Sequence, residues 1–217
     1  MTLALGPTDA LIVVDAQYDF LPGGALAVPD GDAILPLVNR LVGAFGQVVF
    51  TQDWHPPGHA SFASSHPGKQ PFETTELAYG EQRLWPDHCV QGSPGARPHA
   101  SLDLDRANLI LRKGMNPQID SYSAFVEADG RTTTGLAAFL KARGVGRVFL
   151  CGLATDFCVG FSALDARAAG FETVVVEDAC RGIDAEGSLV AALAKMEAAG
   201  VVRTTSEAVL GTALTQA

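Results

Sequence analysis

The chain has 217 residues, a formal net charge of -9 and a hydrophobic fraction of 47%. This length and apolar content fit one α/β domain, residues 1–217, that buries its own core. The acidic balance and the lack of Lys/Arg runs argue against a nucleic-acid or anionic-membrane partner, because both require clustered positive charge. We therefore expect a small-molecule ligand, and the sequence leaves monomer and homo-oligomer open.

The cysteines are the four residues Cys89, Cys151, Cys158 and Cys180, spread far apart in the chain. The N-terminal segment has neither a basic n-region nor a sustained apolar stretch, so we expect no signal peptide and no membrane span. Widely spaced cysteines in such a chain predict free thiols in a reducing, cytoplasmic compartment.

Apolar runs alternate with amphipathic segments from the start of the chain. Residues 9–15 form a continuous apolar run that ends on Asp15. A buried parallel strand has this pattern when its carboxyl end opens into a site. Residues 34–45 have helical periodicity, and residues 47–51 predict a second strand that leads into Asp53.

A long segment without periodicity, at about residues 53–105, follows the second strand. It is rich in Pro, Gly, Ser and His and contains all five histidines. A connection of this length is unusual in a compact domain, so we expect a functional loop or lid.

The second half of the chain continues the alternation. The predicted elements are strand 108–113 ending on Lys113, helix 134–143, strand 148–151, a helix from Cys158 to about 169, strand 171–177, helix 185–199 and a short strand at 201–204. This order predicts a single-domain α/β fold with a mostly parallel six-stranded sheet and helices on both faces. Ligands bind at the carboxyl ends of such strands, which places Asp15, Asp53, Lys113 and Cys158 at one edge.

The stretch 147–158 delivers Cys158 to a predicted helix start. Gly152 permits a turn after the apolar strand, and Thr155 or Asp156 can cap the helix. Orphan N–H groups and the helix dipole favour a thiolate there, so we expect the pKa of Cys158 to fall. The alternative is a small buried apolar residue, because free cysteines are commonly buried.

An Asp, a Lys and a Cys at neighbouring strand ends supply the proton acceptor and the cation that a thiol nucleophile needs. Asp15, Lys113 and Cys158 are therefore the candidate catalytic set. Backbone N–H groups of the turn 154–158 are candidate donors to an oxyanion. In the alternative interpretation, Asp15 and Lys113 form a structural ion pair.

A second group of candidate residues lies in the long loop. Asp53 and His55 are two residues apart in an extended segment and so point the same way. A distant histidine such as His88 can complete a facial set for Zn²⁺, Mn²⁺ or Fe²⁺. His59 and His66 compete as ligands, and for any single loop histidine a solvated or capping role is the alternative.

A series of motifs covers nearly the whole chain in order. They are Val14-Asp-Ala-Gln-Tyr-Asp-Phe20, Gln52-Asp-Trp-His-Pro56 with His59-Ala-Ser-Phe62, Leu84-Trp-Pro-Asp-His-Cys-Val-Gln91 with Gly95, Arg112-Lys-Gly114, Asp120-Ser-Tyr-Ser123, Gly152-Leu-Ala-Thr-Asp-Phe-Cys-Val159 and Glu177-Asp-Ala-Cys-Arg-Gly182. With them the chain resembles the nicotinamidase (pyrazinamidase) family of the isochorismatase-like cysteine hydrolase superfamily. The combination of Asp-Trp-His with Trp-Pro-x-His-Cys-Val narrows the resemblance to nicotinamidases.

The resemblance implies the Rossmann-like isochorismatase fold and an activity. That activity is hydrolysis of nicotinamide to nicotinate and ammonia, and of pyrazinamide to pyrazinoate, through a cysteine thioester in NAD salvage. It implies a catalytic triad of Asp15, Lys113 and Cys158. It also implies a cis peptide bond at Leu153-Ala154 that aims the N–H groups of Ala154 and Cys158 at the oxyanion.

The resemblance further implies one divalent metal ion and an aromatic substrate pocket. The implied metal ligands are Asp53, His55 and His88, with zinc as the first choice and manganese or iron as alternatives. A fourth protein ligand stays open among His59, Ser61 and Glu73. The implied substrate walls are Phe20, Trp85 and Tyr122, whose rings suit a pyridine.

Other functions stay open beside this one. The same triad can hydrolyse another small amide, such as a carbamoyl compound. An isochorismatase-like vinyl-ether hydrolase is a further alternative, although that chemistry needs neither Cys158 nor a metal. The last alternative is a catalytically silent module that binds metal or recruits a partner.

Overall fold

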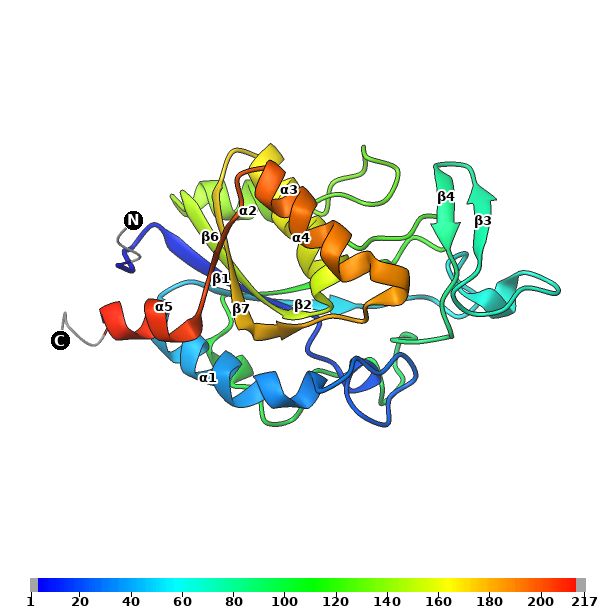
Figure 1. Cartoon of the computed structure of the whole chain (residues 1–217), viewed down its shortest axis with the longest axis horizontal. Helices are drawn as coiled ribbons and strands as arrows, with labels where there is room; N and C mark the ends of the chain where they lie inside the picture. Colours follow the sequence, from blue (N-terminus) through cyan, green and yellow to red (C-terminus); the bar gives the residue numbers. More distant parts are fainter. Residues whose placement is uncertain (1–3, 214–217) are drawn as a thin grey trace.

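A parallel six-stranded sheet organises residues 4–213, the part of the chain that the computed structural model describes (Figure 1). The strand order is β5-β2-β1-β6-β7-β8. The strands are β1 (Asp9–Val14), β2 (Val48–Asp53), β5 (Leu109–Lys113), β6 (Arg147–Leu153), β7 (Glu172–Arg181) and β8 (Val202–Thr204). Every pairing in this sheet is parallel, which confirms the predicted α/β class.

Helices cover both faces of the sheet, as predicted. They are α1 (Leu35–Ala44), α2 (Leu136–Ala142), α3 (Gly160–Ala168), α4 (Ser188–Ala198) and α5 (Ser206–Ala213). Figure 1 shows α1 and α5 together below the sheet and α2, α3 and α4 above it. No helix of residues 4–213 is long and apolar enough to cross a membrane.

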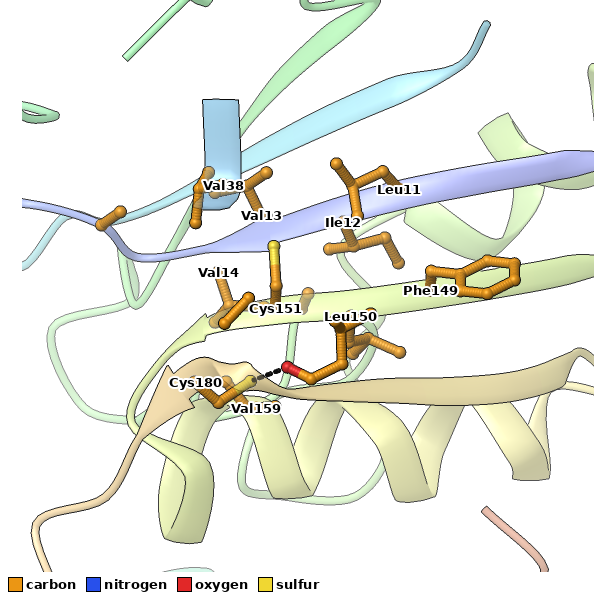
Figure 2. Packing of buried hydrophobic residues seen from close by; sticks show 14 of the residues in the cluster. Leu11, Ile12, Val13, Val14, Val38, Phe149, Leu150, Cys151, Val159 and Cys180 are labelled. Carbon is orange, nitrogen blue, oxygen red and sulfur yellow. Dashed lines mark hydrogen bonds between the residues drawn. The ribbon is translucent and has the colours of Figure 1, made fainter. Parts of the chain in front are cut away.

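The core lies around the two central strands. All residues of β1 are buried, and β6 is buried from Val148 onward. Figure 2 shows side chains of β1 and β6 packed between Val38 of α1 and Val159. Apolar, mostly β-branched or aromatic side chains buried on both faces are what a central parallel strand requires.

Two of the free cysteines belong to this core. Cys151 lies in β6 with no exposed surface, and Cys180 is buried in β7. The Cys180 thiol donates a hydrogen bond to the Val176 carbonyl at 3.3 Å (Figure 2). Burial raises the pKa of both thiols, so they act as small apolar residues.

The side of the sheet on which successive strands are added changes between β1 and β6. The strands after β1 add on one side in the order β2, β5, and the later ones add on the other side in the order β6, β7, β8. Such a switch point opens a crevice outside the carboxyl ends of the two central strands. Asp15 follows β1 and Ala154 follows β6, so the crevice lies between the predicted site segments.

Glycine is required at the end of β6. Gly152 has a φ of +117°, and a Cβ there would lie 2.1 Å from the Val14 carbonyl oxygen. The close approach of β6 to β1 at this point therefore excludes any side chain. The pairing of β6 with β7 also shifts its register between Leu150 and Gly152.

Four elements differ from the sequence prediction. The long loop contains a hairpin of β3 (Thr74–Leu77) and β4 (Gly80–Arg83), and β7 runs on to Arg181 instead of ending at 177. Helix α5 was not predicted. The hairpin escapes prediction because its short strands are polar and half exposed, whereas the alternation that marks a strand needs one buried face.

Candidate active site

The carboxyl ends of four neighbouring strands meet at one edge of the sheet. Asp15 directly follows β1, Asp53 ends β2 and Lys113 ends β5. Asp53 and Lys113 are paired in the β2–β5 register. Cys158 lies in a π-helical turn, Thr155–Val159, between β6 and α3. The sheet thus brings together the four residues that the ends of the predicted strands indicated.

Lys113 is at the centre of this group. Its Nζ lies 2.8 Å from Asp15 Oδ2, 3.0 Å from Asp53 Oδ1 and 3.4 Å from Cys158 Sγ. It also donates a hydrogen bond to the Ser121 carbonyl at 2.9 Å. The side chains of Lys113 and Asp15 have no exposed surface. A single buried ammonium therefore contacts both carboxylates and the thiol.

Asp15 is held in place by Thr51. Its Oδ1 accepts a hydrogen bond from Thr51 Oγ1 at 2.5 Å, and its backbone N–H donates to the same Oγ1 at 3.1 Å. Burial raises the pKa of Asp15; Lys113 lowers it and Asp53 raises it, and the pKa lies above its ordinary value. A carboxylate with a raised pKa is the stronger base.

The pKa prediction for Cys158 is wrong in this structure. Burial raises the pKa of the thiol well above its ordinary value, and Lys113 lowers it too little to compensate, while Asp15 and Asp53 raise it further. The local dipole argument neglected the two carboxylates that the fold brings to the thiol. Cys158 is therefore a buried thiol that needs an adjacent base.

The prediction that Thr155 or Asp156 caps the helix is wrong. The residue at the cap position of the π-helical turn is Ala154, and no side chain makes a capping hydrogen bond there. Asp156 instead accepts hydrogen bonds from the backbone N–H groups of Ile183 at 2.9 Å and Asp184 at 2.8 Å, and from Ser188 Oγ. It fixes the segment after β7 against the turn that carries Cys158. The peptide bond Leu153–Ala154 is cis, as the resemblance implied.

The three predicted metal-ligand residues converge on one point. The ligand atoms of Asp53, His55 and His88 lie within 4.8 Å of one another, and all three residues are buried. His55 Nε2 is 3.0 Å and His88 Nε2 is 3.3 Å from Asp53 Oδ2. His55 Nδ1 lies 3.0 Å from the Gly114 carbonyl and His88 Nδ1 lies 2.8 Å from the Pro86 carbonyl.

These carbonyl contacts decide which ring nitrogens can bind a cation. A carbonyl oxygen only accepts, so each Nδ1 carries the hydrogen and each neutral ring turns the lone pair of its Nε2 toward Asp53. Two imidazole lone pairs and a carboxylate oxygen then face one another, which is the donor set of a divalent metal site. The residues therefore fit the metal that the resemblance implied.

The candidates for a fourth ligand are engaged in other contacts. His59 Nε2 lies 2.8 Å from the Asn116 carbonyl and its Nδ1 lies 2.7 Å from Ser61 Oγ. Glu73 accepts a hydrogen bond from the Gln70 N–H at 3.0 Å and is exposed. In this arrangement His59 and Ser61 are partners of one another, and Glu73 lies on the surface.

A small cavity is lined in part by Cys158. Its lining includes all three predicted walls, Phe20, Trp85 and Tyr122, and also Asp53, His88 and Ala154. The lining residues that sequence reasoning missed are Leu26, Asp120, Phe157 and Ile183. The ring of Phe157 stands edge-on to that of Trp85, with centroids 4.8 Å apart.

Sequence reasoning also missed the role of Gln17. This buried side chain donates hydrogen bonds to the carbonyls of Asp53 at 2.8 Å and Ala96 at 2.9 Å, and accepts one from the Asp53 N–H at 2.8 Å. It thereby fixes the backbone of Asp53 where the long loop begins. The signal in the sequence that could have identified this role is the position of Gln17, two residues after Asp15.

Comparison with known proteins agrees with this site. The family described as isochorismatase domain matches residues 9–208. The chain belongs to the isochorismatase family. Among the curated members that this isochorismatase-family chain resembles, the nicotinamidase of Acinetobacter baylyi is 55% identical over 201 residues, covering 93% of this chain and 94% of the relative. The nicotinamidase of Escherichia coli is 43% identical, covering 89% and 93%.

Solved structures of the isochorismatase family show the same fold. A nicotinamidase/pyrazinamidase from Acinetobacter baumanii has a TM-score of 0.92 at 57% identity, covering 93% of this chain and 97% of its own. PnC1 from L. infantum in complex with nicotinate has a TM-score of 0.84 at 44% identity, covering 96% and 98%. The pyrazinamidase of Pyrococcus horikoshii in complex with zinc has a TM-score of 0.74 at 39% identity, covering 92% and 99%. The resemblance to nicotinamidases is thereby confirmed.

Proposed function

We propose that this isochorismatase-family protein hydrolyses nicotinamide to nicotinate and ammonia, and pyrazinamide to pyrazinoate, in NAD salvage. The observation that carries the proposal is the buried contact of Lys113 with both Asp15 and Cys158 beside an aromatic cavity. The names of the two curated relatives and the nicotinate complex support the substrate class.

Asp15, Lys113 and Cys158 divide the chemistry. Asp15 takes the thiol proton, Lys113 stabilises the thiolate, and the sulfur attacks the carboxamide carbon, so that an S–C bond forms and the carbonyl electron pair moves to oxygen. When this intermediate collapses, the C–N bond breaks and Asp15 returns its proton to the leaving ammonia. A water then gives a proton to Asp15 and attacks the thioester carbon. The C–S bond breaks, Asp15 passes its proton to the sulfur to restore the thiol, and the carboxylic acid product loses its own proton to solvent and leaves as nicotinate.

The oxyanion is assigned to the turn after β6. The backbone N–H groups of Ala154 and Cys158 are the proposed donors, since both residues line the cavity in which the carboxamide must lie. Backbone donors held by a rigid strand-to-helix turn need no reorganisation when the negative charge develops.

Asp53, His55 and His88 are the proposed metal ligands, and zinc is the proposed ion. The zinc complex of the Pyrococcus horikoshii relative supports this identity. Asp53 and His88 line the same cavity as Cys158, so a bound ion would supply a Lewis-acidic partner for the ring nitrogen of a substrate that lies there. Phe20, Trp85 and Tyr122 are the proposed walls for the pyridine ring.

The long loop at about residues 53–105 is the proposed metal-binding and substrate loop, because His55, Trp85 and His88 come from it. We also propose a cytoplasmic location and no nucleic-acid or membrane partner. The four buried free cysteines and the net charge of -9 support these assignments.

Ammonia release from nicotinamide by protein of measured metal content tests the proposal. Wild type is expected to turn over nicotinamide and pyrazinamide far faster than an aliphatic amide. Cys158→Ala is expected to lose turnover while its melting temperature stays near that of wild type. If a carbamoyl or aliphatic amide is turned over faster than nicotinamide, then nicotinamide is not the substrate. Appreciable turnover by Cys158→Ala would exclude the thioester route.

A further inference from the structure

The side chain of Gln82 has no part in the proposed triad or metal group. It lies in β4 and is 2% exposed, although the neighbouring residue Glu81 is exposed and the β3–β4 hairpin projects away from the main sheet (Figure 1). A buried side-chain amide is costly unless its donors and acceptor are all paired. The contacts of Gln82 therefore indicate what its burial achieves.

The amide of Gln82 joins four other groups. Its Nε2 has two hydrogens and lies within hydrogen-bond distance of three acceptors, so one N–H is shared between two of them: Asp120 Oδ2 at 2.8 Å, the Arg83 carbonyl at 2.6 Å and Tyr122 Oη at 3.0 Å. Its Oε1 accepts a hydrogen bond from Tyr79 Oη at 3.0 Å. A carboxylate and a carbonyl can only accept, so the NH₂ group must face Asp120 and Arg83.

These hydrogen bonds reach the walls of the substrate cavity. Tyr122 Oη also accepts a hydrogen bond from Trp85 Nε1 at 2.9 Å, so one hydroxyl oxygen connects two aromatic walls to Gln82. The two rings stand at 90° with centroids 6.2 Å apart. Asp120, 2% exposed, is a third wall of the cavity. One side chain from the hairpin is thus hydrogen-bonded to two of these walls and reaches the third, Trp85, through Tyr122.

We propose that Gln82 is a positioning residue that fixes Trp85, Tyr122 and Asp120 for binding of a flat heteroaromatic amide. The inference rests on the proposed function, because nicotinamide is the substrate that these walls would receive. The hydrogen bonds of Gln82 reach none of Asp15, Lys113 and Cys158, so it acts on substrate binding and leaves the chemical steps unchanged. A satisfied buried network of this kind holds a pocket in one conformation before the ligand arrives.

Two near-isosteric substitutions test the inference. Gln82→Met keeps the volume and removes every hydrogen bond, whereas Gln82→Glu places an acceptor against the Asp120 carboxylate and the Arg83 carbonyl. The KM for nicotinamide is expected to rise about tenfold in Gln82→Met and further in Gln82→Glu, which is the scale of one or two lost hydrogen bonds. The kcat is expected to stay within about threefold of wild type. The control Glu81→Gln, on the adjacent exposed residue, is expected to change neither.

Two readouts separate positioning from a general loss of structure. The rate of Cys158 alkylation by iodoacetamide, measured without substrate, is expected to equal that of wild type in Gln82→Met because the triad is intact. In a double-mutant cycle, Gln82→Met and Tyr122→Phe are expected to raise KM by less together than the product of their separate effects, because both break the same connection.

Wild-type turnover of nicotinamide is measured first, and its absence overturns the proposed function. With normal wild-type turnover, an unchanged KM in Gln82→Met overturns the positioning role alone. Multiplicative effects of Gln82→Met and Tyr122→Phe on KM also overturn it. So does a parallel fall of kcat and alkylation rate in Gln82→Met, because that result means damage to the triad.

Discussion

At the residue scale, Lys113 determines how charge is distributed in the site. Burial lowers its pKa, but the charges of Asp15 and Asp53 outweigh burial and hold the pKa well above its ordinary value. Lys113 is therefore a permanent cation, and the proton that moves in the proposed reaction belongs to Cys158 and Asp15. An ammonium that never titrates can stabilise a thiolate without competing for its proton.

The sequence predicted which side chains meet but not how they titrate. Asp15 and Lys113 were found because each follows or ends an apolar run, and strand ends in a parallel sheet share an edge. The pKa of Cys158 depends on burial and on the two carboxylates around it, which come from other strands. Such tertiary effects leave no mark in the local sequence of the turn.

Thr51 provides a test of the assignment of Asp15 as the base. Its hydroxyl donates to Asp15 Oδ1 and lowers the pKa of Asp15 by stabilising the ionised form. Thr51→Val removes this donor, so the pKa of Asp15 rises further and the acid limb of the kcat/KM profile is expected to move to higher pH. Activity falls as the pH drops through this pKa because a protonated carboxyl cannot accept the thiol proton.

The profile is measured with nicotinamide between about pH 5 and pH 8, where a raised carboxyl pKa becomes visible. Thr51→Ser is the control, because it keeps the hydroxyl and is expected to keep the wild-type acid limb. A shift of the acid limb to lower pH in Thr51→Val would contradict the role of Asp15 as base.

At the element scale, strand ends and the irregular segments that follow them supply the site residues together. The long strands were predictable because continuous apolar runs mark buried parallel strands. The π-helical turn at Thr155–Val159 was not, because Asp156 is drawn to Ile183 and Asp184 in a distant segment and does not cap a helix. Gln82 and its hairpin also escaped, since a short polar strand differs little from a loop in sequence.

The end of β5 makes a prediction about the metal group. Gly114 has a φ of +67°, and a Cβ there would lie 2.5 Å from His55 Cε1 and 2.7 Å from His55 Nδ1. Gly114→Ala is therefore expected to displace the His55 ring and to lower the bound metal per chain, as measured by mass spectrometry after dialysis. The KM for nicotinamide is expected to rise with the loss of metal.

Gly130→Ala is the matched control for this substitution. Gly130 has the same φ of +67°, but no atom lies within 4 Å of a Cβ built there. Both variants carry a similar backbone strain of about 1–2 kcal/mol, and only Gly114→Ala reaches the metal group. Equal metal contents in the two variants would refute the assignment of His55 as a ligand.

At the scale of the whole molecule, the two edges of the sheet have different tasks. The carboxyl edge carries the site, and the opposite edge carries an ion pair between the partly buried Arg147, which begins β6, and the buried Asp9, which begins β1. The Arg147 guanidinium donates to Asp9 Oδ1 at 2.8 Å and to Oδ2 at 2.7 Å, and the Asp9 side chain is 3% exposed. The fold class was predictable from the order of elements, but this pair was not, because its members are far apart in the chain.

Removal of this pair is expected to change stability and leave catalysis intact. Arg147→Met leaves a buried carboxylate without its cation and is expected to lower the free energy of unfolding by about 2 kcal/mol, with kcat and KM unchanged. Arg106→Met breaks the exposed pair with Asp103 and is expected to stay within about 0.5 kcal/mol of wild type. Denaturant titration measures both, and an equal effect of the two substitutions would contradict the separation of the edges.

Trp85 and the proposed nucleophile Cys158 come from different segments of the chain, and this has a consequence for engineering. The proposed reacting groups lie at or just beyond the carboxyl ends of sheet strands, whereas Trp85 and the β3–β4 hairpin belong to an insertion between β2 and β5. Substitutions or length changes in that insertion can therefore alter which amide fits while the reacting groups keep their spacing. A mutant library that is screened for hydrolysis of other amides should therefore vary the residues of the β3–β4 hairpin.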